Sequence, residues 1–244
     1  MIPKIIHYCW FGRNPLPESA VKCIDSWRRF FPDYEIKEWN EDNFDVHLIP
    51  YTAEAYAAKK YAFVSDYARF WILYHHGGVY FDTDVEVIKP MDDIIERGPF
   101  MGIEDFYPDG TYPMVAPGLG IAVNAGHEFY KKLLDYYATI HFMLEDGSLN
   151  QETVVRHTTK LLVEAGMQPH TELQEVSGIW IYPKDYFNPL DDLTGRLTKT
   201  ENTRSIHWFA RTWQSRHPLT QWLSRLSHRL FGMKLHHLKK KLRK

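Results

Sequence analysis

The sequence predicts an α/β fold in which helices flank a mostly parallel central sheet. Residues 2–9 and 34–39 have strand character, and residues 18–30 between them have helical character. A strand, a helix and a strand within about 40 residues make a βαβ unit, whose two strands are parallel. At 244 residues the chain is also long enough for one sizeable core. We therefore expect one α/β domain over residues 1–215 and a helical tail over residues 216–244.

The first elements each have a local signal. Residues 2–9 are apolar enough for a strand in the centre of a parallel sheet. Residues 34–39 alternate between apolar and polar side chains, as a half-buried strand does. The helix at 18–30 is indicated by apolar side chains that recur at helical spacing, namely Val21, Ile24 and Trp27.

The stretch from Ser65 to Val87 organises the rest of the chain. It begins as a helix, preceded by a shorter helix at 53–59. Gly77 and Gly78 end it, since glycine accepts the left-handed conformation common at helix ends. The strand-forming residues 79–81 follow. The helical period is set by Tyr67, Phe70, Trp71 and Tyr74.

Asp82 and Asp84 come directly after the strand at 79–81. In an extended chain their side chains project on the same face, because side chains alternate along a strand. Two neighbouring carboxylates repel each other unless a cation or hydrogen-bond donors lie between them. A hard divalent cation such as Mn²⁺ or Mg²⁺ prefers oxygen ligands and can also hold a substrate diphosphate. The pair therefore indicates a metal-diphosphate site.

Other uses of an Asp-x-Asp pair fit less well. An EF-hand loop needs Gly at its sixth position and Glu at its twelfth, where this chain has Val87 and Asp93. A phosphohydrolase motif would have a hydroxyl residue or valine in place of Glu86. Glycosidase carboxylates usually come from separate elements, roughly 5 Å or more apart. A phosphohydrolase and a catalytically idle glycan- or lipid-binding module stay open as alternatives.

The carboxylate pair belongs to a longer motif. It reads Ser65-Asp66-x-x-Arg69, Leu73 and Gly77-Gly78-x-Tyr80-x-Asp82-x-Asp84. This motif resembles the DXD-containing glycosyltransferase sugar-binding family, which includes Golgi mannosyltransferases, bacterial capsule and lipopolysaccharide transferases and, more distantly, the large glucosylating toxins. The resemblance implies a GT-A-type nucleotide-sugar domain over residues 1–215.

The resemblance also implies roles for four catalytic residues. Asp84, with Asp82 nearby, would hold the divalent cation, and Asp82 would also approach the ribose. Asp66 would accept hydrogen bonds from hydroxyls of the donor sugar. Arg69 would lie near the sugar and phosphate, where its planar guanidinium can hold oxygens in two places.

Three further residues are expected at the donor site. Trp10 follows the first strand, and ligands of open α/β sheets bind beyond the carboxyl ends of strands. It could stack on a nucleotide base, and the resemblance favours this role over that of a core tryptophan. Ser65 and Tyr80 belong to the family motif and are expected to contact the donor.

The second half of the domain is less informative. Residues 106–118 are rich in Pro, Gly, Asp and Tyr, which indicates a loop over the site. Asn124 ends a strand and is either a substrate contact or a turn residue. The other expected elements are strands at 100–104, 119–123 and 179–182 and helices at 127–141 and 152–165.

Residues 205–213 resemble the family's closing motif, a His followed by a Ser-Trp pair. The resemblance implies that His207 approaches the metal or the diphosphate. Trp213 could donate its indole N–H to a phosphate oxygen. Thr212 stands where Ser is usual, which keeps the hydroxyl and adds a methyl group.

The charge of the chain is divided unevenly. No acidic residue follows Glu201, whereas 11 Lys and Arg lie from Arg204 to the end. The preceding residues carry the other 18 basic and all 31 acidic residues, a balance of −13. Residues 218–244 combine eight of these cations with apolar residues at helical spacing, which indicates a basic amphipathic helix on an anionic membrane surface. Docking on the domain is the alternative, and no nucleic-acid partner is expected.

These observations predict a metal-dependent, retaining glycosyltransferase. It would move a hexose from a nucleotide diphosphate-sugar, with a UDP-sugar favoured and GDP-mannose possible, to a glycan or lipid-linked glycan in surface polysaccharide synthesis. The chain has no apolar run of 18 residues, no signal pattern and only two cysteines. We expect a cytoplasmic protein at the inner face of the membrane.

Overall fold

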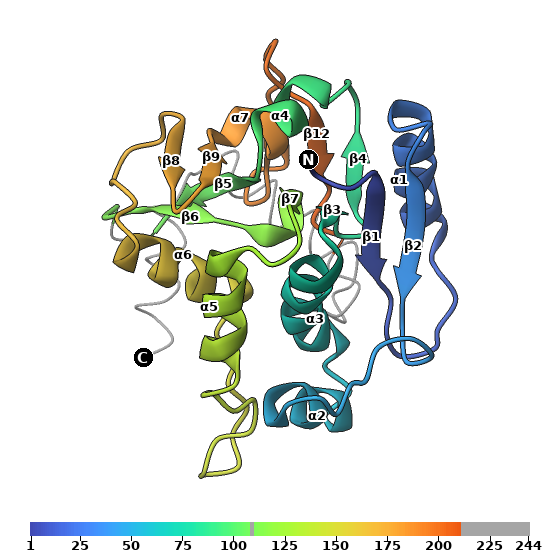
Figure 1. The fold of residues 1–244 in the computed structure, drawn as a ribbon, viewed down its shortest axis with the longest axis vertical. Helices are drawn as coiled ribbons and strands as arrows, with labels where there is room; N and C mark the ends of the chain where they lie inside the picture. Colours follow the sequence, from blue (N-terminus) through green and yellow to red (C-terminus); the bar gives the residue numbers. More distant parts are fainter. Residues whose placement is uncertain (108–109, 211–244) are drawn as a thin grey trace.

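The computed structural model describes residues 1–107 and 110–210 as an α/β fold, which confirms the predicted class (Figure 1). Its central sheet has eight strands in the order β2-β1-β3-β7-β5-β9-β8, with β6 paired to β5. Within these described ranges, no helix has both the length and the apolar character needed to cross a membrane. The predicted tail, residues 216–244, lies outside the described residues.

Strands and helices are interspersed along the chain. The strands of the central sheet are β1 (Ile5–Cys9), β2 (Glu35–Trp39), β3 (Gly78–Tyr80), β5 (Phe100–Phe106), β6 (Pro113–Val115), β7 (Ile121–Val123), β8 (Gln174–Val176) and β9 (Ile179–Tyr182). The helices are α1 (Glu18–Phe30), α2 (Pro50–Ala57), α3 (Tyr61–His76), α4 (Asp92–Arg97), η1 (Pro117–Leu119), α5 (Glu128–Tyr137), α6 (Val154–Glu164) and α7 (Lys184–Phe187).

The sheet is parallel around β1 and antiparallel around β7. Strand β1 pairs in parallel with β2 and with β3, as the βαβ unit predicts, and β5 and β9 are also parallel. Strand β7 runs antiparallel to both of its neighbours, β3 and β5. Strands β6 and β8 are antiparallel to their partners as well. The chain therefore leaves β1, β2 and β3 at the same edge of the sheet.

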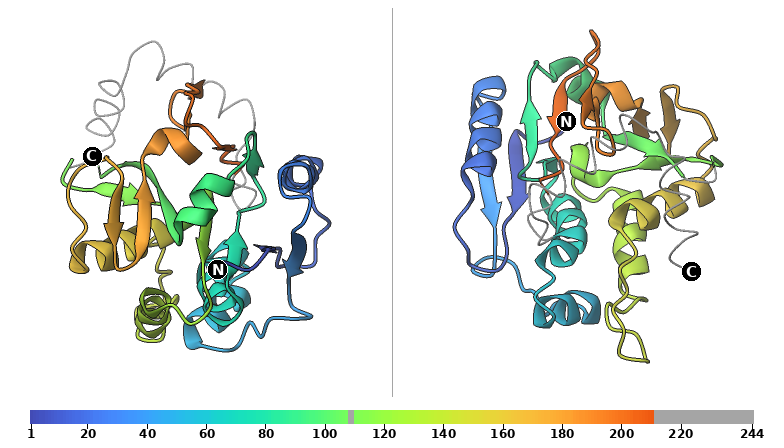
Figure 2. Two further views of the ribbon diagram at one scale, coloured as in Figure 1. Left: turned by 45° about the horizontal axis from the view of Figure 1, so that its top comes forward. Right: turned by 180° about the vertical axis from the view of Figure 1, so that it is seen from behind.

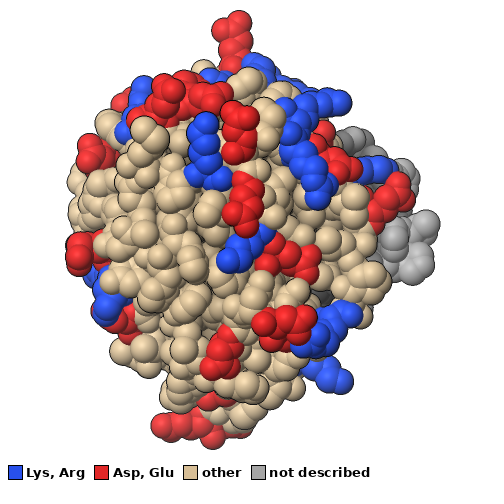
Figure 3. All heavy atoms as spheres, turned by 45° about the vertical axis from the view of Figure 1, so that its right-hand side comes forward, with Lys and Arg blue, Asp and Glu red and all other residues tan. Residues whose placement is uncertain are grey.

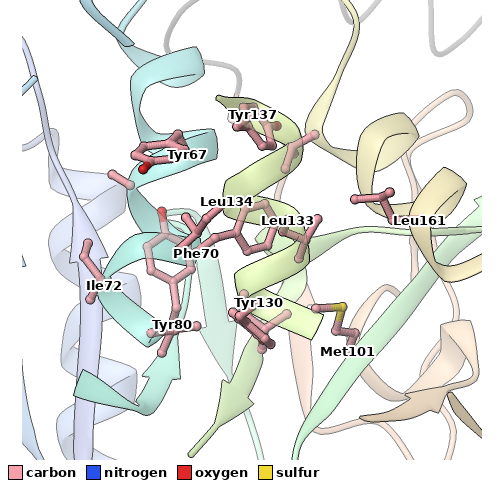
Figure 4. Close-up of a cluster of buried hydrophobic side chains, with 14 of the residues drawn as sticks. Tyr67, Phe70, Ile72, Tyr80, Met101, Tyr130, Leu133, Leu134, Tyr137 and Leu161 are labelled. Carbon is pink, nitrogen blue, oxygen red and sulfur yellow. The ribbon is translucent and has the colours of Figure 1, made fainter. Parts of the chain in front are cut away.

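Apolar side chains fill both faces of the sheet. Successive residues of β3 and β5 alternate between two buried clusters, as strand geometry requires. One cluster lies against α2, α3, α5 and α6, and Figure 4 shows its side chains between α3, α5 and the sheet. The other lies against α1, α4 and α7. The sheet is thus the middle of three layers, the arrangement expected of an α/β fold.

A small second sheet forms from segments far apart in the chain. Strand β4 (Val85–Val87) pairs antiparallel with β12 (Ser205–His207), and the two lie side by side in Figure 2. Another two-stranded sheet joins β10 (Leu190–Asp191) to β11 (Arg196–Leu197). The pairing of β4 with β12 returns the end of the described chain to the Asp-x-Asp stretch.

Two local expectations need correction. Residues 106–118 were expected to be a loop, but they contain β6 and most of η1, and β6 pairs with β5. Val21 was placed on the apolar face of α1, but it is 41% exposed. The buried face of this helix is made by Ala20, Cys23, Ile24 and Trp27.

The outer surface beside α1 and β2 carries interspersed charges of both signs (Figure 3). Among them are exposed pairs between Lys22 and Glu18 and between Arg28 and Asp25. Such exposed pairs contribute little to stability. Neither sign dominates among the described residues of this face, so they form no charged patch that would bind an anionic or cationic partner.

We predict that Trp27→Ala destabilises the protein by about 3–5 kcal/mol, the range for truncating a buried aromatic residue. Trp27 is fully buried, contacts Phe81, and donates its indole N–H to the Val85 carbonyl oxygen at 2.8 Å. Denaturant unfolding would measure the loss. Val21→Ala on the same helix is the control, with a change below about 0.5 kcal/mol because the side chain is largely exposed. Equal losses in both variants would contradict the packing described here.

Candidate active site

Trp10 and Asp82 lie beyond two adjacent parallel strands, at one edge of the sheet. His7 of β1 pairs with Tyr80 of β3, so the chain leaves both strands on the same side. Trp10 is partly buried, and its indole N–H donates to the Asn14 carbonyl oxygen at 2.6 Å. This edge is the ligand-binding position of open α/β sheets, and contact of Trp10 with a nucleotide stays a prediction.

The guanidinium of Arg69 joins two carboxylates in the interior. Its Nη2 lies 2.9 Å from Oδ1 of Asp66, and its Nη1 lies 3.3 Å from Oδ1 of Asp82. Its Nε donates to the Ser65 carbonyl oxygen at 3.0 Å, and its guanidinium lies 4.9 Å from the centre of the Tyr80 ring. Arg69 is only 3% exposed. A buried charge needs such partners, so this residue fixes the two carboxylates relative to each other.

Asp66 has an unusually high affinity for a proton. Burial raises the pKa of this carboxyl to about 7, and Arg69 offsets only part of that rise. Among the described residues, its one hydrogen bond comes from Arg69. A buried carboxylate is stabilised by additional donors, and substrate hydroxyls would supply them. The geometry therefore suits the expected role of Asp66 in accepting hydrogen bonds from a sugar.

Asp84 and His207 form the second part of the site. His207 Nε2 lies 3.0 Å from Oδ1 of Asp84, and the backbone N–H of Ala210 donates to Oδ2 at 2.8 Å. Burial opposes the charging of His207, but the Asp84 carboxylate raises the pKa of His207 to about 9. The same pairing, together with the Ala210 hydrogen bond, lowers the pKa of Asp84 against the effect of burial.

The side chains of Asp82, Asp84 and His207 can converge on one cation. Each offers a ligand atom, and the three atoms lie within 4.8 Å of one another. Two carboxylates and an imidazole form a donor set that suits Mn²⁺, and Mg²⁺ with more water in its shell. The proton on His207 would leave when a metal binds, because the ligand is the neutral imidazole. These residues therefore fit the divalent cation that the sequence predicts.

Two other expected donor-site residues, Tyr80 and Ser65, make hydrogen bonds within the protein. The Tyr80 side chain is buried, and its hydroxyl donates to Oδ1 of Asp82 at 3.0 Å. The Ser65 hydroxyl donates to the Tyr61 carbonyl oxygen within α3 at 3.2 Å. Both residues thus position Asp82 or Arg69, which leaves direct donor contact as a prediction for each.

The structure does not bring every expected residue to this edge. Asn124 follows β7, which is antiparallel to β3, and Val123 pairs with Gly78 at the opposite end of that strand. Asn124 therefore lies at the far edge of the sheet, away from Asp82. Thr212 and Trp213 lie outside the described residues.

Glu104 is a carboxylate near the site that the sequence analysis missed. It is the extra residue of a β-bulge, between Ile103 and Asp105 on β5. Bulges often re-aim a side chain beside an active site. Burial raises the pKa of Glu104, and the charge of His207 opposes this rise more than that of Lys184 does. No local sequence signal marks a bulge of this kind, because it depends on the pairing of β5 with β6.

The segment that carries the motif is similar in sequence to known proteins. Residues 17–101 match the model of the family described as "Glycosyltransferase sugar-binding region containing DXD motif". This segment is similar to the DXD-containing sugar-binding region of glycosyltransferases. It includes Arg69, Asp82 and Asp84, which the structure brings together.

Proteins of two yeasts are similar in sequence to part of this chain. Inositol phosphoceramide mannosyltransferase 1 of Schizosaccharomyces pombe is 32% identical over 111 residues, which are 41% of this chain and 33% of that protein. A mannosyl phosphorylinositol ceramide synthase of Saccharomyces cerevisiae is 30% identical over 109 residues, 41% of this chain and 28% of that protein. The chain thus matches about a third of the length of these relatives.

Two glycosyltransferases are among the solved structures that superpose on this chain. The PaToxG glycosyltransferase superposes with a TM-score of 0.49 and 21% identity, over 67% of this chain and 69% of that chain. The galactosyltransferase LgtC superposes with a TM-score of 0.46 and 13% identity, over 93% of this chain and 94% of that chain.

We predict that Gly118→Ala destabilises the protein by about 1–3 kcal/mol, the usual cost of overpacking. A Cβ at position 118 would collide with Oδ2 of Asp82 and lie 3.5 Å from Nη1 of Arg69. Denaturant unfolding in the Asp82→Ala background provides the control, since that variant removes the colliding atom. The cost of Gly118→Ala should nearly vanish there. The same cost in both backgrounds would show that Gly118 does not position Asp82.

We predict that Asp66 makes the folded state less stable as pH rises from about 4 to about 7. Its pKa is near 3.8 in an ordinary environment and about 7 in the folded protein, so the folded state binds the proton more tightly. The free energy of unfolding then falls across this window and levels off above it. Asp66→Asn should lose this term, so its stability relative to the wild type should rise with pH. Parallel stability curves from pH 4 to 8 would contradict the shift.

Proposed function

We propose that the protein is a metal-dependent glycosyltransferase that moves a hexose from a nucleotide diphosphate-sugar to an acceptor hydroxyl. The main support is the convergence of Asp82, Asp84 and His207 within 4.8 Å, beside the buried pair of Asp66 and Arg69. A metal-binding group next to a buried carboxylate that accepts only the Arg69 hydrogen bond among the described residues suits a ligand with both a diphosphate and a sugar. The family match of residues 17–101 supports the same reaction class.

The charges of the site suit departure of a nucleoside diphosphate. A divalent cation held by Asp84, Asp82 and His207 would supply stabilisation for the negative charge of the departing diphosphate. Arg69 stays positive because it lies between two carboxylates, and it would hold the donor near its phosphates. Asp66 would orient the sugar by accepting hydrogen bonds from its hydroxyl groups. The resemblance implies retention with attack on the front face, so no carboxylate nucleophile is assigned.

The donor sugar and the acceptor are proposed from the relatives. Two yeast relatives are named as a mannosyltransferase of inositol phosphoceramide and a mannosyl phosphorylinositol ceramide synthase. Mannose is therefore a candidate hexose, with GDP-mannose as its donor, beside the UDP-sugars that the motif favours. A glycan or a lipid-linked glycan remains the proposed acceptor. Binding of residues 218–244 to an anionic membrane stays a prediction.

The donor class can be tested by thermal stability with Mn²⁺ and a panel of UDP-, GDP- and CMP-sugars and free nucleotides. A ligand at 100 times its Kd should stabilise the fold by about 2.7 kcal/mol. We expect a shift that depends on the metal and is confined to one nucleotide. Release of phosphate from simple phosphoesters, without any nucleotide-dependent shift, would instead support the phosphohydrolase alternative.

We predict that Asp84→Asn lowers turnover of the matching nucleotide-sugar at least 100-fold, while the fold is kept. The amide keeps the shape of the side chain but removes the charge that would hold the metal. Donor turnover and far-UV circular dichroism would be measured together. Asp92→Asn, on the exposed start of α4, is the matched control and should retain full activity. An active Asp84→Asn enzyme would exclude the metal assignment.

A further inference from the structure

Two buried tyrosine hydroxyls have no hydrogen-bond partner among residues 1–107 and 110–210. Tyr51 on α2 and Tyr137 on α5 are both 0% exposed. Within the part of the chain that the structure describes, neither phenol oxygen makes a hydrogen bond. A buried hydroxyl without a partner is costly, and most such groups in proteins are paired. Two of them on rings that contact each other leave donors and acceptors that a polar ligand would satisfy.

The two tyrosines belong to one aromatic cluster, which also contains the residue that follows Asp66. The rings of Tyr51 and Tyr137 contact each other edge to face, with centroids 5.1 Å apart. Tyr137 also contacts Tyr67, the neighbour of Asp66 in the chain, at 5.9 Å, and Figure 4 shows these two side chains on facing helices. Burial raises the pKa of both Tyr51 and Tyr137, and the Asp66 charge raises each further. One carboxylate thus acts on both phenols.

The Asp66 side chain is partly exposed to solvent. The side chain of Asp66 is 11% exposed, whereas that of Arg69 is 4% exposed. One carboxylate oxygen is occupied by Arg69 at 2.9 Å. The cluster therefore offers a carboxylate that needs donors, beside two hydroxyls that can both donate and accept. Its charge is already balanced by Arg69, so it suits a neutral ligand rich in hydroxyl groups.

We propose that Asp66, Tyr51 and Tyr137 form a specificity subsite that reads the hydroxyl pattern of the transferred hexose. The proposal rests on the proposed function, because it identifies the hexose of the donor as the ligand. A ring hydroxyl of the sugar donates a hydrogen bond to the Asp66 carboxylate and accepts a hydrogen bond from a phenol. An analogue without that hydroxyl would leave buried polar groups unpaired, which is how enzymes discriminate strongly against such analogues.

The test uses Tyr51→Phe and Tyr137→Phe, which remove only the unpaired hydroxyls. Affinities of wild type and variants for UDP-glucose, GDP-mannose, UDP and GDP would be measured by calorimetry with Mn²⁺. The comparison uses whichever nucleotide-sugar the wild type binds. We expect each variant to bind that nucleotide-sugar about 3- to 10-fold more weakly than the wild type does, which corresponds to the loss of one hydrogen bond. Affinity for the free nucleoside diphosphate should not change. Thermal stability should be unchanged or slightly higher, because an unpaired buried hydroxyl is removed.

Tyr130→Phe is the matched control. Tyr130 lies on α5 like Tyr137, is 0% exposed, and also has a hydroxyl without a partner among the described residues. Burial alone raises the pKa of Tyr130, and no charged group contributes. This variant should bind nucleotide-sugar and nucleotide as the wild type does.

The outcomes separate the subsite from the proposed function. If wild type binds a nucleotide-sugar and both Tyr51→Phe and Tyr137→Phe bind it equally well, the subsite is wrong and the glycosyltransferase assignment stands. An equal loss for nucleotide-sugar and free nucleotide would also overturn the subsite, since the hydroxyls would not act on the sugar. If wild type binds no nucleotide and no nucleotide-sugar, the proposed function fails and the subsite fails with it.

Discussion

The buried guanidinium of Arg69 is the interaction on which the rest of the site depends. It lies between Asp66 and Asp82, and its side chain is only 4% exposed. Removing one partner of a buried ion pair is strongly destabilising, because the other charge is left uncompensated. Helix α3 and the end of β3 are therefore held in one register. This places the carboxylate that would read the sugar and the carboxylates that would hold the metal side by side before any substrate binds.

A second constraint closes the site from a distant part of the chain. Strand β12 pairs with β4 and brings His207 to Asp84, which precedes it by more than 120 residues. The Ala210 N–H binds the same carboxylate. The metal-binding group is thus complete only when the α/β layers between these strands have folded. Local stability of the small sheet is thereby linked to the affinity of the site for a cation.

The sequence was most informative where the function is carried by contiguous residues. The helix, glycine break and strand over residues 65–84 follow from local patterns, and the family motif adds the roles of Asp66 and Arg69. The positions of other residues depend on pairing and packing between segments far apart in the chain, which local sequence patterns do not predict. Asn124 was expected at the site, but β7 is antiparallel and carries it to the opposite edge. Glu104 depends on a bulge in β5, and the hydroxyls of Tyr51 and Tyr137 depend on how α2 and α5 pack against α3; none of these has a local signature.

The central claim is that one divalent cation binds between Asp82, Asp84 and His207 and carries the diphosphate of a nucleotide-sugar. The most direct test is a crystal soaked with Mn²⁺ and the matching nucleoside diphosphate, with anomalous diffraction collected to locate manganese. We expect a single anomalous peak between these three side chains, in contact with the diphosphate. A peak elsewhere, or a diphosphate bound at this edge of the sheet without any metal, would contradict it.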